Sequence, residues 1–423
     1  MPRPPDRSKL GDENPDRAAP DWPAAVIAGA FQTGVLGVRS LIRRGVRALC
    51  FDCHLDYPGF RSVYGPAHAC PDPDVDAQGW VDFMIGLAGK MGGKPVLIPS
   101  ADQFVSAIAA HADTLSQHYV FSPGIRLQSL LATKEAQYAL AAEHGMPLPR
   151  TKLARSEEDV RDFVYEARFP CVLKPLHFRQ WESVPDGHAL SEKKVVVAET
   201  PQSLMTAWRL AAAINSNVIV QEMIEGPDTA KRVYVSCYDR DGRRIANAMF
   251  RELRCSPVQF GTATVSEPVV DGETDEICDR WLRSLGYSGI CEIEMKRDSR
   301  DGRIKMIEAN PRLTGGGDAA PYAGVDVCWL HYLDLVGRPV SPVGSSGRDF
   351  RHVMLRPDLS TIIAYRRAGL ISWTDVLRSY KPPLAFYDFD PRDWRYSTDT
   401  LYRMIRGAVG ELVRSGWPRR RPS

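Results

Sequence analysis

Residues 290–296, ICEIEMK, and residues 304–312, IKMIEANPR, decide the fold of this chain, with a polar turn around Arg300-Asp301-Gly302 between them. Polar and apolar residues alternate through much of both runs. This alternation is typical of β-strands, whose successive side chains point to opposite faces of a sheet. The two runs and their turn therefore predict an antiparallel hairpin.

The position of the turn determines which residues of the hairpin face one another. With residue 301 near its centre, Glu294 lies opposite Glu308, and Glu292 lies opposite Asn310. Arg312 continues the same face. The other face carries residues that belong in a core, namely Cys291, Ile293, Ile307 and Ala309.

Carboxylates that face one another across two strands repel, so this face of the hairpin needs a compensating cation. Carboxylate and amide oxygens suit Mg²⁺, which keeps waters and phosphate oxygens in its remaining positions. We therefore expect Glu294, Glu308 and Asn310 to bind Mg²⁺, with Mn²⁺ as an alternative ion, and Glu292 to lie behind them. The competing interpretation is a solvated charged face on an edge hairpin.

Two lysines are candidates for contacts with phosphate groups. Lys134 falls in the first turn of a helix that we expect to be capped by Thr133 and to stop at Gly145. Lys174 ends the strand-like run 169–174 and precedes a long polar loop over 175–193. A lysine ammonium group is a compact point charge suited to phosphate, although a lone lysine is more often a surface charge.

The segment 220–228, VQEMIEGPD, lies between these lysines and the hairpin. Here an apolar strand runs into an acidic stretch and a Gly-Pro turn. Backbone groups in such a segment can face an adenine edge, and a carboxylate a few residues on can take ribose hydroxyls. Read alone, the segment is simply a strand that leaves its sheet.

The N-terminal region alternates strand and helix patterns. Strands over 25–28, 47–51 and 95–99 alternate with helical character over 38–44 and 104–111. This order predicts the opening of a doubly wound α/β sheet.

A dinucleotide site in this region is an alternative, because Asp52 lies at a suitable distance beyond Gly29 to bind a ribose hydroxyl. However, Gly29, Gly34 and Gly37 are spaced G-x4-G-x2-G and not G-x-G-x-x-G. We expect a structural turn here, or a surface that helps to hold a second substrate.

Composition argues against several classes of protein. With 54 basic and 52 acidic residues, the formal net charge of +2 is too small for a large nucleic-acid surface. No apolar run reaches the roughly 18 residues that suggest a membrane span. The first twenty residues lack the apolar core of an export signal, so we expect a cytoplasmic protein.

The nine cysteines fit free thiols in a reducing compartment better than a disulfide framework. The segment from Cys50 to His54 has the C-x-x-C-H form of a haem attachment site. That chemistry requires export, so we expect packing thiols here in preference to a haem site or a redox pair.

In their order along the chain, these segments resemble the ATP-grasp superfamily. The likeness covers roughly Val26 to Arg338, and its most specific part is the hairpin that ends Glu-Ala-Asn-Pro-Arg at residues 308–312. The segments 169–181 and 250–267 look closest to the predicted carboxylate–amine ligases, a group that includes D-aspartate ligase.

The resemblance implies an α/β and α+β protein with an ATP-grasp fold in which ATP lies between two lobes. We expect an arm over 1–21, a Rossmann-like domain over 22–122, an ATP-grasp domain over 123–342, and a C-terminal element over 343–423 with a helix over 399–413. Homodimer formation stays open.

The resemblance also implies a role for each matching residue. Phosphates would be held by Lys134 and Lys174, adenine by the hinge Gln221, Glu222, Met223 and Ile224, ribose by Asp228, metal by Glu294, Glu308 and Asn310, and the transferring phosphoryl group by Arg312. Arg251 and Arg254 are candidates to hold a carboxylate substrate, with a surface role as the alternative. The sequence departs from the family in the loop after Lys174, which has no glycine before Gly187; Arg179, Lys193 or Lys194 would then close over the nucleotide.

The reaction implied is the ATP-dependent joining of a small-molecule carboxylate to an amine through an acyl phosphate, with release of ADP. Two alternatives remain. One keeps the ATP site in a carboxylase or small-molecule kinase, and the other is a non-catalytic nucleotide-binding protein.

Overall fold

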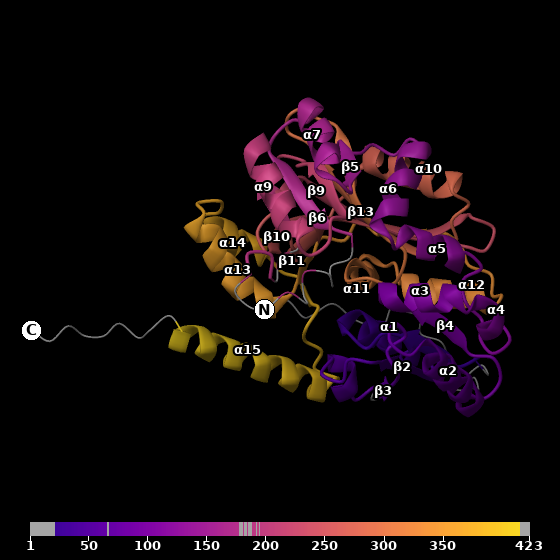
Figure 1. Cartoon of the computed structure of the whole chain (residues 1–423). Coiled ribbons are helices and arrows are strands. Elements are labelled where there is room, and N and C mark those ends of the chain that lie inside the picture. The colour runs from indigo at the N-terminus through magenta and orange to yellow at the C-terminus, as the bar shows by residue number, and fades with distance from the viewer. Residues whose placement is uncertain are drawn as a thin grey trace, which may run out of the picture.

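The computed structural model of the protein describes residues 22–414, except residues 66, 177–180, 182–183, 185–187, 192 and 194, and no side chains beyond residue 406. Its strands form three sheets, which Figure 1 shows together with their helices. The arm expected over 1–21 lies outside the described residues, as do Arg179 and Lys194 of the long loop.

The first sheet is parallel, in the order β3-β2-β1-β4. Strands β1, β2 and β4 are mostly buried, whereas the short edge strand β3 is exposed. Helices pack on both faces of the sheet, as the doubly wound pattern predicts. The elements are β1 (Ala25–Ala28), α1 (Gln32–Ile42), β2 (Ala48–Asp52), η2 (Pro58–Arg61), β3 (His68–Ala69), α2 (Ala77–Met91), β4 (Val96–Pro99), α3 (Asp102–Ala110) and α4 (Ala112–Leu115).

Helix α1 starts six residues earlier than the helical character expected from residue 38, so two of the three glycines lie inside it. The reason is close packing. A Cβ on Gly34 would lie 1.9 Å from the carbonyl oxygen of Gly29, and one on Gly37 would lie 2.9 Å from Leu313. These glycines bring α1 against β1 and against the chain that follows the hairpin.

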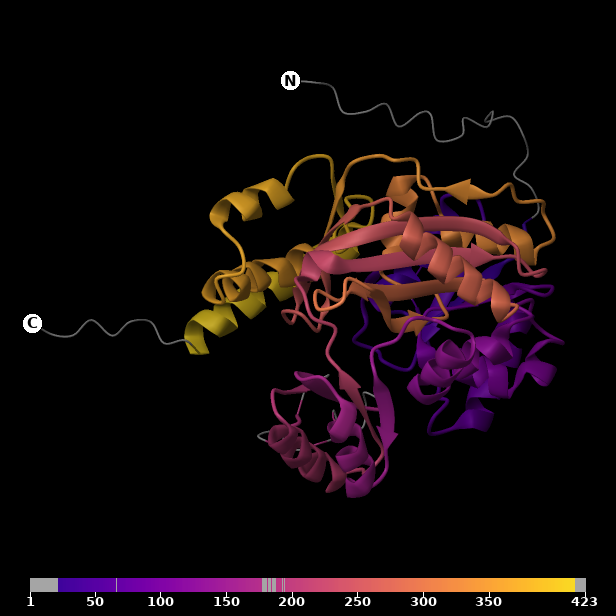
Figure 2. The same ribbon diagram turned by 90° about the horizontal axis from the view of Figure 1, so that it is seen from above.

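The second sheet is antiparallel, in the order β5-β8-β6-β7, and two helices cover it. Figure 2 shows it as a lobe set to one side of the remaining chain. Its elements are β5 (Thr151–Ala154), α7 (Glu157–Glu166), β6 (Cys171–Pro175), β7 (Val196–Ala198), α9 (Pro201–Ala212) and β8 (Val218–Glu222), and the preceding helices α5 (Ile125–Leu131) and α6 (Lys134–Glu143) lead into it.

The third sheet has the order β13-β12-β9-β10-β11-β15-β16, and β14 pairs with β10. At the acidic residues its hairpin has the register predicted from the sequence, because Glu294 pairs with Glu308 and Glu292 pairs with Asn310. Closer to the turn a bulge shifts the register by one residue, so that Met295 pairs with Met306 and not with residue 307. The elements are η3 (Asp228–Ala230), β9 (Lys231–Tyr238), β10 (Arg244–Ser256), β11 (Thr262–Pro268), α10 (Gly272–Ser284), β12 (Gly289–Arg297), β13 (Ile304–Asn310), α11 (Gly316–Ala319), η4 (Ala320–Ala323), α12 (Val327–Leu335), β14 (Val343–Gly344), β15 (Arg351–Val353) and β16 (Leu384–Phe386).

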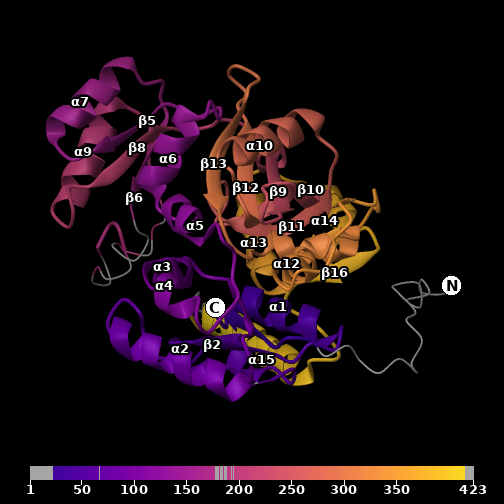
Figure 3. The same cartoon turned by 90° about the vertical axis from the view of Figure 1, so that its right-hand side faces the viewer.

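Each face of this sheet has its own core. Tyr234, Ile293 and Ala309 pack with residues of α10, whereas Val233 and Val235 pack with residues of α1 and α12. The second face continues along the strands into the acidic residues of the hairpin. Figure 3 shows the second-sheet lobe beside β13, with the first domain below.

The large sheet continues across the boundary expected at residue 342, because β15 and β16 extend it. Three helices follow in this region: α13 (Leu355–Arg367), α14 (Trp373–Ser379) and α15 (Trp394–Arg414). Two buried ion pairs attach α13 and the start of α15 to the rest of the protein. Arg254 binds Asp358 of α13 at 2.7 Å, and Arg39 of α1 binds Asp393, just before α15, at 2.6 Å. No helix among the described residues is long and apolar enough to cross a membrane.

We predict that Arg254→Ala lowers the free energy of unfolding by about 3 kcal/mol, because the substitution leaves the Asp358 carboxylate buried without its cation. Urea denaturation followed by circular dichroism measures this change. The control is Arg126→Ala, which removes an exposed ion pair to Asp113 and should cost under about 1 kcal/mol. Equal unfolding midpoints for the two variants would refute the anchoring role of Arg254.

Candidate active site

The centre of the candidate site is the pair Glu294 and Glu308, which lie side by side on β12 and β13 and are both partly buried. Neither carboxylate has a hydrogen-bond or ion-pair partner among the described side chains. Asn310 follows on the same face and is buried, and its Oδ1 accepts a bond from Arg312 at 3.3 Å. The structure thus brings together the oxygens of two carboxylates without ion-pair partners and of one amide.

The electrostatics of this pair favour a bound cation. Burial raises the pKa of Glu294 to about 8, and repulsion by Glu308, Glu252 and Glu292 adds to the shift. Hard oxygen donors that repel one another in this way fit a divalent ion such as Mg²⁺. The residues present therefore fit the metal expected from the sequence.

Lys174, near the end of β6, contacts the hinge and lies near the acidic pair. Its Nζ donates to Oε1 of Gln221 at 2.8 Å. Burial lowers the pKa of Lys174, while Glu308 and Glu294 oppose that shift. This charge comes from the second-sheet lobe, whereas the carboxylates belong to the third sheet.

Lys134 is the first residue of α6, and α6 is fastened to β13. Gln137 donates to the carbonyl oxygen of Ala309 at 2.6 Å and accepts from its amide at 3.1 Å. Tyr138 donates to the carbonyl oxygen of Ile307 at 2.8 Å. Thr133 precedes the helix, but its hydroxyl donates to Leu130 and forms no cap, unlike our expectation.

The hinge after β8 is held mainly through two of its residues. Glu222 accepts from the amide of Arg168 at 2.9 Å. The Met223 amide donates to Pro170 at 3.0 Å, and its carbonyl oxygen accepts from Arg300 at 2.6 Å. The backbone of Ile224, the next residue, forms no hydrogen bond with another backbone group of the described chain. The Ile224 backbone is thus available for one of the expected adenine contacts.

Arg312 connects the hairpin to the first domain. Its guanidinium makes two bonds to the Asp102 carboxylate, at 2.6 Å and 3.0 Å, where α3 begins. Glu292 behind it accepts from Thr314 at 2.7 Å and from the Gly316 amide at 3.0 Å. A Cβ at residue 316 would lie 2.2 Å from that carboxylate, so glycine is required for this contact. Glu292 thereby orders the loop that follows Arg312.

No protein-family model matches the chain. Over 247 residues it is 28% identical to D-aspartate ligase of Enterococcus faecium (strain Aus0004), covering 55% of this chain and 58% of that protein. Over 193 residues it is 28% identical to D-alanine–D-alanine ligase of Pseudomonas entomophila (strain L48), covering 43% of this chain and 53% of that protein. The chain thus spans little more than half the length of these relatives.

A solved structure covers more of the chain. N5-carboxyaminoimidazole synthetase from Staphylococcus aureus, complexed with ADP, superimposes with a TM-score of 0.62 and 15% identity over 82% of this chain and 87% of that chain. The chain has the ATP-grasp fold. The fold expected from the sequence is therefore confirmed, together with the likeness to D-aspartate ligase.

Arg254 does not join the candidate site of this ATP-grasp fold. Its guanidinium is buried and is bound by Asp358 at 3.0 Å and 2.7 Å and by Ser379 at 2.7 Å. Contrary to our expectation, Arg254 is therefore not available to hold a carboxylate substrate. Its neighbour Arg251 pairs with Glu267 and is 41% exposed.

Sequence reasoning missed two charged residues that lie beside the candidate site. Lys231 opens β9 and Glu252 lies on β10, and their side chains are 3.0 Å apart and buried. Both contribute to the field at Glu294. Lys231 lies two residues before Val233, which pairs with Glu294, so both side chains point to the same face of the sheet as Glu294. The alternation of β9 therefore contained the information that Lys231 faces the acidic pair.

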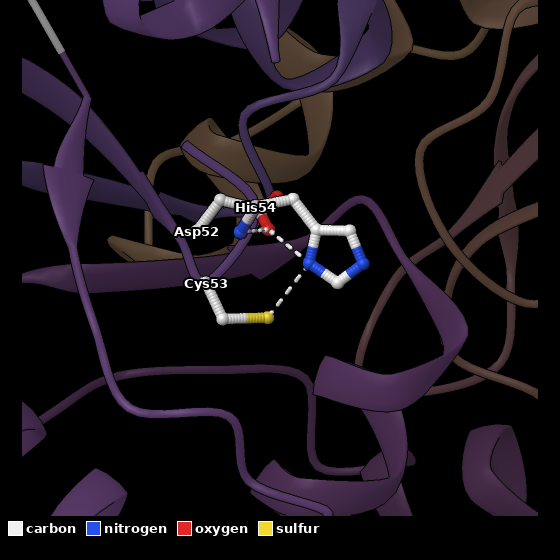
Figure 4. A group of neighbouring side chains, drawn as sticks. All are labelled: Asp52, Cys53 and His54. Atoms are coloured by element: carbon white, nitrogen blue, oxygen red, sulfur yellow. Dashed lines mark hydrogen bonds and ion pairs between the residues drawn. The ribbon is translucent and has the colours of Figure 1, made fainter. Parts of the chain in front are cut away.

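The segment that resembles a haem attachment site places Asp52, Cys53 and His54 close together (Figure 4). The Asp52 oxygens already accept from the amides of Ala30 at 2.8 Å and His54 at 3.0 Å. Burial and nearby carboxylates raise the pKa of Cys53 to about 11, which keeps it a thiol at neutral pH. These side chains brace the loop after β1, and neither the ribose role of Asp52 nor a haem role is supported.

We predict that Mg²⁺ raises the melting temperature more at pH 8.5 than at pH 6. The raised pKa of Glu294 means that its proton stabilises the metal-free protein at low pH and that this stability is lost as the pH rises through about 8. A bound cation replaces this proton, so the rise in melting temperature caused by Mg²⁺ becomes larger over the same pH interval. Differential scanning fluorimetry measures both curves, and Glu294→Gln should abolish the pH dependence of the shift. A shift that is equal at both pH values would contradict this account.

Proposed function

We propose that the protein is an ADP-forming ligase that joins a carboxylate to an amine through an acyl phosphate. The observation that carries this proposal is the unneutralised pair Glu294 and Glu308, with Lys174 nearby, in an ATP-grasp fold. Repelling carboxylates beside a partly buried ammonium group suit a metal–triphosphate complex, which carries both signs of charge.

The nucleotide would bind between the second-sheet lobe and the third sheet. Lys174 and Lys134 would hold phosphates. Lys174 lies near the carboxylates, Lys134 opens the helix that is bonded to β13, and neither lysine forms an ion pair with a described acidic side chain. Glu222, Met223 and Ile224 would flank adenine, and Asp228 would bind ribose. Mg²⁺, or Mn²⁺ in its place, would be held by Glu294, Glu308 and Asn310 and would neutralise charge on the phosphate oxygens.

In the first step, a carboxylate oxygen of the substrate attacks the γ-phosphorus, and the bond to the bridging oxygen of ADP breaks. In the second step, the amine nitrogen attacks the acyl carbon, phosphate leaves, and the amine proton passes to solvent. Arg312, held beside Asn310 by Asp102, would stabilise negative charge on the transferring group. Positioning and charge supply most of the rate in such a scheme.

The two curated relatives bear on the substrates. Both are named as ligases of amino acids, D-aspartate in one and D-alanine in the other. Their names support an amino acid for at least one of the two groups joined here. The test is a screen of amino acids for ADP release, with hydroxylamine added to trap an acyl phosphate as a hydroxamate. ADP release that needs an amino acid, with ATP-dependent hydroxamate, supports the ligase. ADP release without hydroxamate would point to a kinase.

We predict that Glu308→Gln lowers turnover at least about 100-fold, because it removes a charged metal ligand beside the phosphates. Turnover is measured by coupled ADP release at saturating ATP. Glu135→Gln is the control, since Glu135 lies on α6 and pairs with Arg155. Near wild-type turnover of Glu308→Gln in a folded protein would remove Glu308 from the site.

Lys174→Ala should raise the KM for ATP by roughly tenfold or more, since one charge-assisted phosphate contact is lost. Steady-state kinetics with varied ATP measures this change. The matched control is Lys152→Ala on β5 of the same sheet, where the lysine pairs with Asp159 and Asp162. An unchanged KM in Lys174→Ala, equal to that of the control, would exclude a phosphate contact.

A further inference from the structure

Helix α13, the first helix of the C-terminal element, reaches into the region expected to bind ribose. It lies beside β10 and β11 (Figure 1) and carries Tyr365, which is 3% exposed. The Tyr365 hydroxyl donates to Oδ2 of Asp228 and accepts from the Cys255 amide at 2.9 Å. A residue 137 positions further along the chain thus holds one oxygen of this carboxylate in place.

The other oxygen of the same carboxylate is unsatisfied. Asp228 is 6% exposed, and its Oδ1 is buried without a hydrogen-bond partner among the described residues. The nearest cation is Lys231, at 3.6 Å, and this ammonium group lies closer to Glu252, at 3.0 Å. Lys231 thus gives this oxygen an ion pair but no hydrogen bond. A buried carboxylate oxygen without a hydrogen bond is costly, so Oδ1 is suited to accept one from a bound ligand.

The position of α13 is itself fixed independently of Tyr365. Asp358, seven residues earlier on the helix, accepts from two of the three Arg254 guanidinium nitrogens. It also accepts from the hydroxyls of Thr264 and Tyr380. The helix therefore presents Tyr365 from a rigid support. The Tyr365 hydroxyl donates the hydrogen bond that holds Oδ2 of Asp228 in place.

We propose that Tyr365 is a positioning residue for the nucleotide: it fixes Asp228 through Oδ2 so that Oδ1 accepts a ribose hydroxyl. This inference rests on the proposed function only in that a nucleotide binds at the hinge. It makes the C-terminal element part of the nucleotide site, although that element lies more than a hundred residues beyond the hinge in the sequence. Tyr365 touches no reacting atom, so it affects how the nucleotide is bound and oriented.

The test compares binding of ADP and 2′,3′-dideoxy-ADP, with Mg²⁺, by isothermal titration calorimetry on the full chain. The wild type should bind ADP at least roughly tenfold more tightly, because dideoxy-ADP cannot donate to the charged carboxylate. Tyr365→Phe should reduce that ratio at least about threefold, and Asp228→Asn should reduce it further. The matched control is Tyr380→Phe, which removes a similar bond to a buried carboxylate of the same element and should keep the wild-type ratio. Circular dichroism confirms that each variant is folded.

Two results would overturn the inference while leaving the proposed function intact. One is a Tyr365→Phe ratio equal to that of the wild type and of Tyr380→Phe. The other is wild-type binding that does not distinguish the two nucleotides. Failure of the wild type to bind ADP at all would overturn the proposed function and this inference together.

Discussion

The repulsion between Glu294 and Glu308 is the constraint on which the rest of this structure depends. The hairpin fixes the two carboxylates opposite one another, and partial burial prevents water from screening them fully. A sheet that retains such a pair needs a cation from outside the protein. Helix α6 is bonded to β13, and Lys174 comes from the second-sheet lobe. A triphosphate bound beside the carboxylates would therefore join two separate lobes.

The sequence predicted the hairpin because strand alternation and turn position are local properties. Nine residues on one side of the turn and seven on the other suffice to place Glu294 opposite Glu308. The same local logic gave the parallel strands of the first sheet. It failed at α1, where Gly34 and Gly37 look like loop residues and are in fact helical. Only the neighbouring Gly29 and Leu313 explain them, and those contacts cannot be seen in a single sequence.

The partners of the site's other charged residues depend on long-range contacts, and these were the part that sequence reasoning missed. In the sequence alone, Arg254 looks like a substrate-binding arginine. In the structure its guanidinium is bonded to Asp358, about a hundred residues later, and is not available to a substrate. Lys231 and Glu252 meet because β9 and β10 pair. The C-terminal strands and helices were expected to be a separate element, yet they extend the large sheet and deliver Tyr365 to Asp228. An isolated sequence reveals the kind of residue at each position, but not which distant residue neutralises it.

Binding of Mn²⁺, as a paramagnetic substitute for Mg²⁺, tests the central claim most directly. Electron paramagnetic resonance reports free Mn²⁺ during a titration of the protein with ADP present, for the wild type and for a Glu294→Gln, Glu308→Gln double variant. The account predicts one or two bound ions in the wild type and loss of tight binding in a double variant that remains folded. Equal Mn²⁺ affinity in the two proteins would contradict it, because the facing carboxylates would then not be what holds the ion.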